Sequence, residues 1–310
     1  MQQIQSINFM KGLLIILVIL GHLIPGNLKE TLSRYFIYSF HMPLFIGISG
    51  YLFNFDKLFL NKNNFLKSFF KRIIIPYIIA NIFYCIFINL PYLINLNIYK
   101  FIFNFIKNSI YSYYHLWYIQ GFISYALILY FLLKKNFNFK LLVSISFIIS
   151  FTVYYFYFHF HSSNPFLRIF LNNFRLYNLI FFTCGFIIKK YNYFLRNNCF
   201  NFLVFVSLFL MNSIATFYLK NEFITMFLFY ISNLYSILYI LTICITLPTL
   251  DVNLINDIGK NSLYIYLYHI APILILKKLY LNDFKLYYFF SLVIFILGVF
   301  TIKTLDKAKI

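Results

Sequence analysis

Acidic side chains are scarce in this sequence, since Asp and Glu together account for 7 of 310 residues. Every one of them falls in a predicted loop or at the end of an apolar segment: Glu30, Asp56, Glu222, Asp251, Asp257, Asp283 and Asp306. Carboxylates are the usual coupling groups of proton- and cation-driven carriers and the usual ligands of hard metal ions. Their absence from the apolar segments argues against both functions.

The sequence also argues against two further classes of protein: those held together by disulfides or bound metal, and those that bind nucleic acid. The four cysteines show no CxxC spacing and lie mostly in apolar runs, so we predict neither a disulfide framework nor a metal site. His159 and His161 share a loop without a third ligand nearby. The net charge of +19 arises because acidic residues are few, and no basic cluster lies on a soluble domain, so nucleic-acid binding is not expected.

Apolar residues, by contrast, are abundant in the sequence. Hydrophobic residues make up 62% of the chain and charged residues 11%, too few polar groups to cover a soluble domain of this length. A helix needs about 20 mainly apolar residues to cross a bilayer, and such windows fall at 9–26, 35–54, 73–93, 115–133, 140–158, 169–188, 199–218, 223–247, 258–276 and 285–303. We therefore predict an all-α integral membrane protein, a single bundle of about ten transmembrane helices forming one domain over residues 1–310.

Orientation and location follow from the loops between these windows. Lys and Arg gather on the side that holds both chain ends, so the positive-inside tendency predicts that both termini are cytoplasmic. The N-terminal apolar run lacks a cleavage site of small residues and is predicted to be a retained helix. We expect a multi-pass protein of the cell inner (plasma) membrane, in contact with membrane lipid.

The first apolar run, KGLLIILVILGHL at Lys11 to Leu23, contains a cation and an imidazole. Lys11 and His22 are separated by about three helical turns, roughly 16 Å, and project from the same face. A buried imidazole favours its neutral form and can act as a general base. A simpler interpretation is that Lys11 flanks the membrane with its amine in water and that His22 only bonds a neighbouring helix.

Five motifs in order extend this pattern: KGLLIILVILGH, FHMPLFIGISGYLF at 40–53, KRIIIPY at 71–77, LWYI at 116–119 and GKNSLYIYLYH at 259–269. Together they resemble the membrane-bound acyltransferase 3 family, in particular its fucose 4-O-acetylase-like branch. In that family a basic residue precedes an essential histidine by ten intervening residues, as Lys11 precedes His22. The resemblance implies about ten membrane helices and transfer of an acetyl group from cytoplasmic acetyl-CoA to a hydroxyl of a glycan or lipid-linked sugar, with no bound cofactor.

The resemblance also assigns expected roles to residues. His22 would be the catalytic base or would carry the acetyl group on its ring, and Lys11 would position the donor or stabilise charge. Asn8 stands where many relatives carry Asp. Lys71 and Arg72 could bind the CoA phosphates, although cations flanking the cytoplasmic end of a helix explain them equally.

Three other residues are predicted to contact the acceptor. His41 lies beside Pro43 in the second window, and His269 ends the last motif. Arg175, within the sixth window, needs a partner or access to the outer surface and could bind an anionic sugar phosphate. Each also has a structural alternative as a helix contact or a solvated group. Trp117 and Tyr118 are typical of an interfacial aromatic belt.

We therefore predict an integral-membrane O-acetyltransferase that acts on a carbohydrate hydroxyl. The alternatives are a polytopic polysaccharide carrier or flippase, or a glycan polymerase. Neither a large extracytoplasmic loop nor a charged cavity is evident in the sequence to favour them.

Overall fold

The computed structural model describes residues 2–24, 31–110, 113, 115–160, 165–219, 221–246 and 253–279. Every regular element within these ranges is helical, which confirms the all-α prediction for that part of the chain. The α-helices are α1 (Gln2–Leu23), α2 (Leu32–Leu52), α3 (Phe55–Leu60), α4 (Lys62–Phe69), α5 (Ile75–Ile94), α6 (Ile98–Ile110), α7 (Trp117–Lys134), α8 (Phe139–Phe160), α9 (Pro165–Phe174), α10 (Leu179–Tyr191), α11 (Cys199–Tyr218), α12 (Glu222–Thr246), α13 (Asn253–Lys260), α14 (Ser262–Tyr268) and α15 (Ile270–Leu279). A π-helix η1 (Phe70–Ile74) joins α4 to α5, and a 3-10 helix η2 (Leu176–Asn178) precedes α10.

Six helical segments of the described residues are long and apolar enough to cross a membrane. They are Gln5–Leu23, Lys62–Ile94, Trp117–Lys134, Phe139–His159, Cys199–Tyr218 and Glu222–Thr246. The predicted window 285–303 lies outside the described residues. A multi-pass membrane protein is thus supported, while ten crossings and cytoplasmic termini stay predictions.

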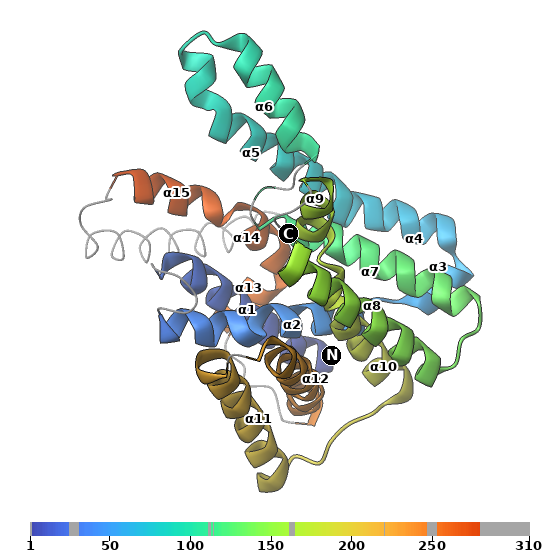
Figure 1. The fold of residues 1–310 in the computed structure, drawn as a ribbon. Coiled ribbons are helices and arrows are strands. Elements are labelled where there is room, and N and C mark those ends of the chain that lie inside the picture. The colour runs from blue at the N-terminus through green and yellow to red at the C-terminus, as the bar shows by residue number, and fades with distance from the viewer. Residues whose placement is uncertain are drawn as a thin grey trace. The chain divides into compact units, whose positions relative to one another are not determined.

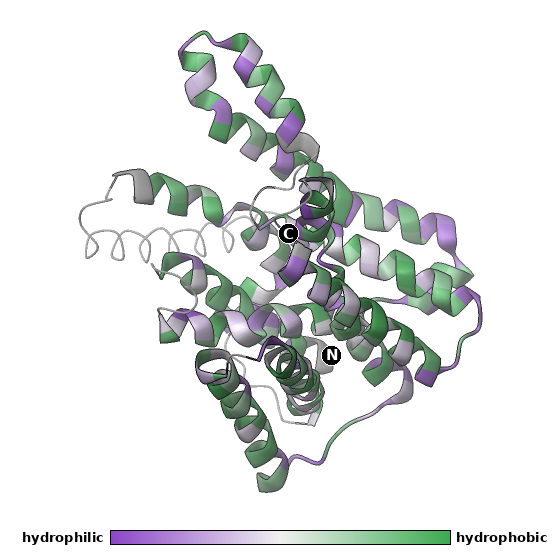
Figure 2. Cartoon of the chain, in the orientation of Figure 1, coloured by the Kyte–Doolittle hydropathy of each residue, from purple (hydrophilic) through white to green (hydrophobic). Residues whose placement is uncertain are grey.

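The outward surfaces of these helices are apolar. Along α11 the exposed side chains include Phe200, Leu203, Leu210 and Ile214, each more than half exposed, and Figure 2 shows α11 and α12 as predominantly hydrophobic. An apolar stripe that the described residues leave exposed is expected of a helix whose solvent is lipid.

The chain forms two compact units, one made of Met1–Ile48 with Tyr191–Ile310 and the other of Ser49–Lys190. We refer to them as unit 1 and unit 2. The boundary falls within α2, whose last turn belongs to unit 2. The expectation of one domain over residues 1–310 stays a prediction.

Unit 1 is built around α1, which packs against α12 and against the segments α13 to α15 (Figure 1). The crossing of α1 with α13 depends on two glycines: a Cβ on Gly12 would overlap the Ile255 carbonyl, and one on Gly259 would overlap the Asn8 carbonyl. Small residues let helix backbones approach in this way. In the same unit, the Asn233 amide of α12 donates to the Ser39 carbonyl of α2 at 3.0 Å.

Unit 2 contains the helical hairpin of α5 and α6 (Figure 1) and a break where a continuous helix was predicted. The window 169–188 is interrupted at Arg175, which adopts a left-handed backbone with φ 42° and ψ 47°. The Tyr125 hydroxyl donates to the Arg175 carbonyl at 2.9 Å, and the Asn178 N–H donates to the same oxygen at 2.9 Å. These two bonds replace the helical partners of that carbonyl and stabilise the break.

Candidate functional site

Helix α1 carries both predicted catalytic side chains. Its interior from Gly12 to Leu20 holds only glycine and aliphatic residues, which form a helix readily when their apolar faces are covered by neighbours or lipid. Lys11 lies before this run, and His22 lies in the last turn. Both side chains are half-buried, so both can be reached by a ligand while they contact the protein.

His22 lies between two aromatic side chains that come from other elements of unit 1. Its ring centroid is 5.3 Å from that of His269, which follows α14 directly, and 6.1 Å from that of Tyr38 on α2. The Tyr38 hydroxyl is 3.4 Å from His22 Nδ1. Three segments distant in the sequence therefore meet at the predicted base.

Tyr38 extends this cluster to a second predicted histidine. Its ring meets that of His41 edge to face, with centroids 5.0 Å apart and planes at 89°. The structure thus brings His22 into contact with His269 and, through the Tyr38 ring, close to His41. Tyr38 was not singled out from the sequence, although its spacing of three residues from His41 places both on one helix face.

Hydrogen bonds fix the tautomers of the two flanking histidines. His41 Nδ1 is 2.6 Å from the Ile37 carbonyl, and His269 Nδ1 is 2.7 Å from the Tyr266 carbonyl. A carbonyl oxygen can only accept, so Nδ1 is the protonated nitrogen in both rings. In a neutral ring, Nε2 is then the nitrogen that accepts a proton. Both side chains are buried, with exposures of 3% and 7%.

A cation that sequence reasoning placed in a loop also belongs to this region. The Arg34 guanidinium lies over the Tyr38 ring, with Cζ 5.3 Å from the centroid, and Nη1 donates to the Ile24 carbonyl at 3.3 Å. Ile24 follows the last turn of α1, so Arg34 adds positive charge at the His22 end of the helix. Its spacing of four residues from Tyr38 was the available signal.

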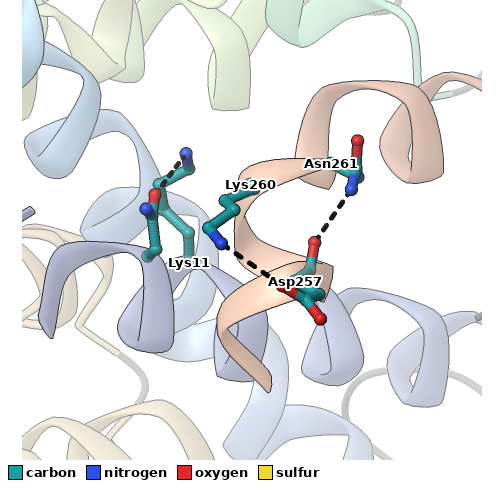
Figure 3. Close-up of polar contacts among 5 residues, drawn as sticks. Lys11, Asp257, Lys260 and Asn261 are labelled. Atoms are coloured by element: carbon teal, nitrogen blue, oxygen red, sulfur yellow. Dashed lines mark hydrogen bonds and ion pairs between the residues drawn. The ribbon is translucent and has the colours of Figure 1, made fainter. Parts of the chain in front are cut away.

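Lys11 lies at the other end of the apolar run, beside the crossing of α1 and α13. Its amine donates to the Asn8 side-chain oxygen at 3.3 Å. On α13, Lys260 pairs with Asp257 at 3.3 Å, and the Asn261 amide donates to the Asp257 carbonyl at 3.1 Å. Figure 3 shows Lys11 and Lys260 on these two neighbouring helices.

The remaining predicted residues belong to unit 2. Lys71 and Arg72 lie in η1 with exposed side chains. Arg175 lies at the break before η2, with its guanidinium carbon 4.0 Å from the centroid of the Trp117 ring. Trp117 is 7% exposed, so its ring is buried against the protein where it contacts Arg175.

Within the described residues, no group of three or more His, Cys, Asp or Glu side chains is arranged to hold a metal ion. The three clustered histidines offer ring nitrogens that can take part in proton transfer. Neutral imidazoles beside a phenol and a guanidinium can accept a proton from an alcohol and stabilise negative charge on it.

Comparison with known families agrees with this chemistry. Residues 4–304 match a family described as an acyltransferase domain. The chain belongs to the acyltransferase 3 family. This membership spans all five motifs and both units, and it favours acyl transfer over the carrier and polymerase alternatives.

Two curated relatives of this acyltransferase 3 protein match over a short segment. The nodulation protein NolL of Sinorhizobium fredii is 54% identical over 54 residues, covering 15% of this chain and 15% of the relative. The nodulation protein NolL of Mesorhizobium japonicum is 56% identical over 54 residues, covering 15% of this chain and 14% of the relative. The match thus spans about one seventh of the relatives' length. No solved structure matches the chain.

Proposed function

We propose that this acyltransferase 3 protein transfers an acetyl group from cytoplasmic acetyl-CoA to a hydroxyl of a cell-surface or lipid-linked glycan. The observation that carries the proposal is the position of His22, which lies in an apolar helix in line with Lys11 and faces Tyr38 and His269. The fucose 4-O-acetylase-like branch, the acetyl donor and the inner (plasma) membrane belong to this proposal.

In the proposed reaction, His22 accepts the proton of the acceptor hydroxyl. The alkoxide oxygen attacks the thioester carbonyl carbon and the C–S bond breaks. Coenzyme A leaves as a thiolate and takes up the proton from the imidazolium. A second route places the acetyl group on the His22 ring before it passes to the acceptor. Both routes need the same side chain.

Four cations take different parts in the proposed reaction. Lys11 lies about three turns before His22 and would hold an anionic group of the donor. Lys71 and Arg72, exposed in η1, would add attraction for the CoA phosphates. Arg34, over the Tyr38 ring, would offset negative charge that develops on the reacting oxygens. His41 and His269 would orient the acceptor hydroxyl through their Nε2 atoms.

The test supplies radiolabelled acetyl-CoA to membrane vesicles that contain the protein and its host glycan. We expect the wild-type protein to incorporate label into glycan, and His22→Ala to reduce incorporation at least about a hundredfold, the usual contribution of a general base. The matched control is His159→Ala, since His159 is an exposed histidine of α8 in unit 2. Full glycan labelling by the His22 variant would refute the assignment of the base, and glycan left unlabelled by the wild type would refute the acceptor class.

A further inference from the structure

Unit 2 contains a second concentration of polar and aromatic groups, separate from the histidines. It consists of Trp117 and Tyr125 of α7, Arg175 at the helix break and Tyr177 of η2, and we call it the Arg175 centre. The Arg175 Cζ lies over the Trp117 ring, 4.0 Å from its centroid. This is a cation–π contact, and the Tyr177 side chain hydrogen-bonds the same guanidinium.

No carboxylate among the described residues forms an ion pair with Arg175. Its Nε donates to the Asn172 carbonyl at 3.3 Å, a bond to a neutral acceptor. A guanidinium has five N–H donors and cannot be deprotonated in a protein. A permanently charged group within an apolar helical unit is expensive to keep without an anion, and such groups generally mark a ligand.

The backbone at this position is strained in a way that points to the same conclusion. Arg175 has φ 42°, a left-handed conformation that is unfavourable for a non-glycine residue. Glycine would adopt it without that cost, yet the chain carries arginine. The Tyr125 hydroxyl holds the Arg175 carbonyl at 2.9 Å. The strained turn therefore fixes the direction of this cation.

Aromatic rings surround the neighbouring turn. The Tyr177 ring lies 5.6 Å from that of Tyr154 and 5.4 Å from that of Tyr157, both on α8. Tyrosines present an apolar face and a hydroxyl together, a combination suited to a ring that bears hydroxyl groups. A guanidinium beside such rings matches the chemistry of a ligand in which a phosphate is linked to a sugar.

We propose that the Arg175 centre binds the phosphate of a lipid-linked sugar, and so identifies the acceptor class of the transferase; this rests on the proposed function. Planar bidentate contacts from arginine to phosphate are strong and directional. Trp117 begins α7 and Arg175 lies near the start of the window 169–188. In the proposed orientation both windows begin on the extracytoplasmic side, where an exported glycolipid presents its phosphate.

The single tryptophan of the chain makes this testable without any activity measurement. Because Trp117 is the only tryptophan, the tryptophan fluorescence of the full-length protein in detergent reports on the Arg175 centre alone. The probe is a sugar joined through diphosphate to a short polyprenyl chain. The comparison ligands are the same sugar and lipid joined without phosphate, and phosphatidylglycerol, which supplies phosphate without a sugar diphosphate.

We expect the probe to cause a saturable change in tryptophan fluorescence. Either comparison ligand should bind at least tenfold more weakly than the probe. The Arg175→Gln variant should bind the probe roughly tenfold to hundredfold more weakly than the wild type. Arg175→Lys should be intermediate, because it keeps the charge and loses the planar fork. Arg168→Gln is the matched control, an exposed arginine of the adjacent helix α9. Arg175→Gly tests for a folding defect, since it accepts the left-handed backbone and should lose binding while unfolding at a temperature no lower than the wild type.

Three outcomes would overturn the proposal: unchanged binding by Arg175→Gln, an equal loss with Arg168→Gln, or equal affinity for phosphatidylglycerol, which would make this a general phospholipid site. The His22→Ala variant should bind the probe as the wild type does. If Arg175-dependent binding is observed and no acetyl reaches the glycan, the proposed function fails alone. If transfer requires His22 while Arg175 variants bind normally, the assignment of the Arg175 centre fails alone.

Discussion

The two units hold their buried polar groups by different means. In unit 1, His41 and His269 each donate Nδ1–H to a carbonyl of a preceding turn of their own segment, at 2.6 and 2.7 Å. In unit 2, Arg175 is held by the face of Trp117 and by a backbone turn that Tyr125 fixes from another helix. Local hydrogen bonds orient the two histidine rings, whereas tertiary contacts hold the permanent charge of Arg175.

The largest expected effect separates the two regions by kinetics. If unit 1 performs the chemistry and the Arg175 centre only binds the acceptor, His22→Ala lowers kcat at least about a hundredfold, whereas Arg175→Gln raises the acceptor KM about tenfold and leaves kcat largely unchanged. Both constants are measured in vesicles with labelled acetyl-CoA and graded amounts of glycolipid. A fall in kcat with Arg175→Gln as large as that of His22→Ala would remove the distinction between the regions.

A smaller effect is expected at the other end of α1. Lys11→Gln should raise the KM for acetyl-CoA about tenfold, the loss of one charge-assisted contact, and should leave the acceptor KM unchanged. Lys260→Gln is the control, since Lys260 lies on the facing helix α13 with its amine exposed and paired with Asp257 (Figure 3). Equal effects of the two substitutions would mean that the charge of the region, and not Lys11, attracts the donor.

The smallest expected effect concerns the packing around Tyr38. A Cβ on Gly21 would lie 2.9 Å from the Tyr38 ring, so Gly21→Ala should shift the ring that lies between His22 and His41. We expect a fall in kcat of roughly fivefold with little change in either KM, because a displaced neighbour disturbs the alignment of the base. Tyr38→Phe keeps the ring and removes the hydroxyl. Full activity in Gly21→Ala would show that Tyr38 plays no part in positioning His22.

The sequence predicted the helical class and the residues of the histidine cluster because both depend on local pattern. Apolar windows of membrane length predicted the six helical segments that are long enough to cross a membrane, and ordered motifs singled out His22, His41 and His269. The sequence did not single out Tyr38 and Arg34. Neither residue type indicates a functional site by itself, and their proximity to His22 depends on the packing of the end of α1 against α2. Their helical spacing, Arg34 to Tyr38 and Tyr38 to His41, could be read from the sequence, but it does not by itself indicate contact with His22.

The break at Arg175 could not be predicted from the window 169–188. Its apolar composition favours a continuous helix, and neither proline nor glycine stands at the break. The turn exists because Tyr125, fifty residues earlier in the chain, donates to the Arg175 carbonyl, a tertiary contact that overrides local propensity. The contact of Trp117 with Arg175 is equally long-range. From the sequence, Trp117 and its neighbour Tyr118 could be predicted only as part of an interfacial aromatic belt.

The unbroken first helix has a consequence for donor choice. Nothing interrupts α1 between Lys11 and His22, and the glycine crossing with α13 holds its early turns against a second backbone. The interval from ammonium to imidazole is therefore a rigid ruler of about 16 Å, set by the rise of the helix. If Lys11 binds the charged part of the donor and His22 is the base, as proposed, a thioester whose charged tail is much shorter than this interval cannot reach both, so the length of α1 would select long donors such as acetyl-CoA.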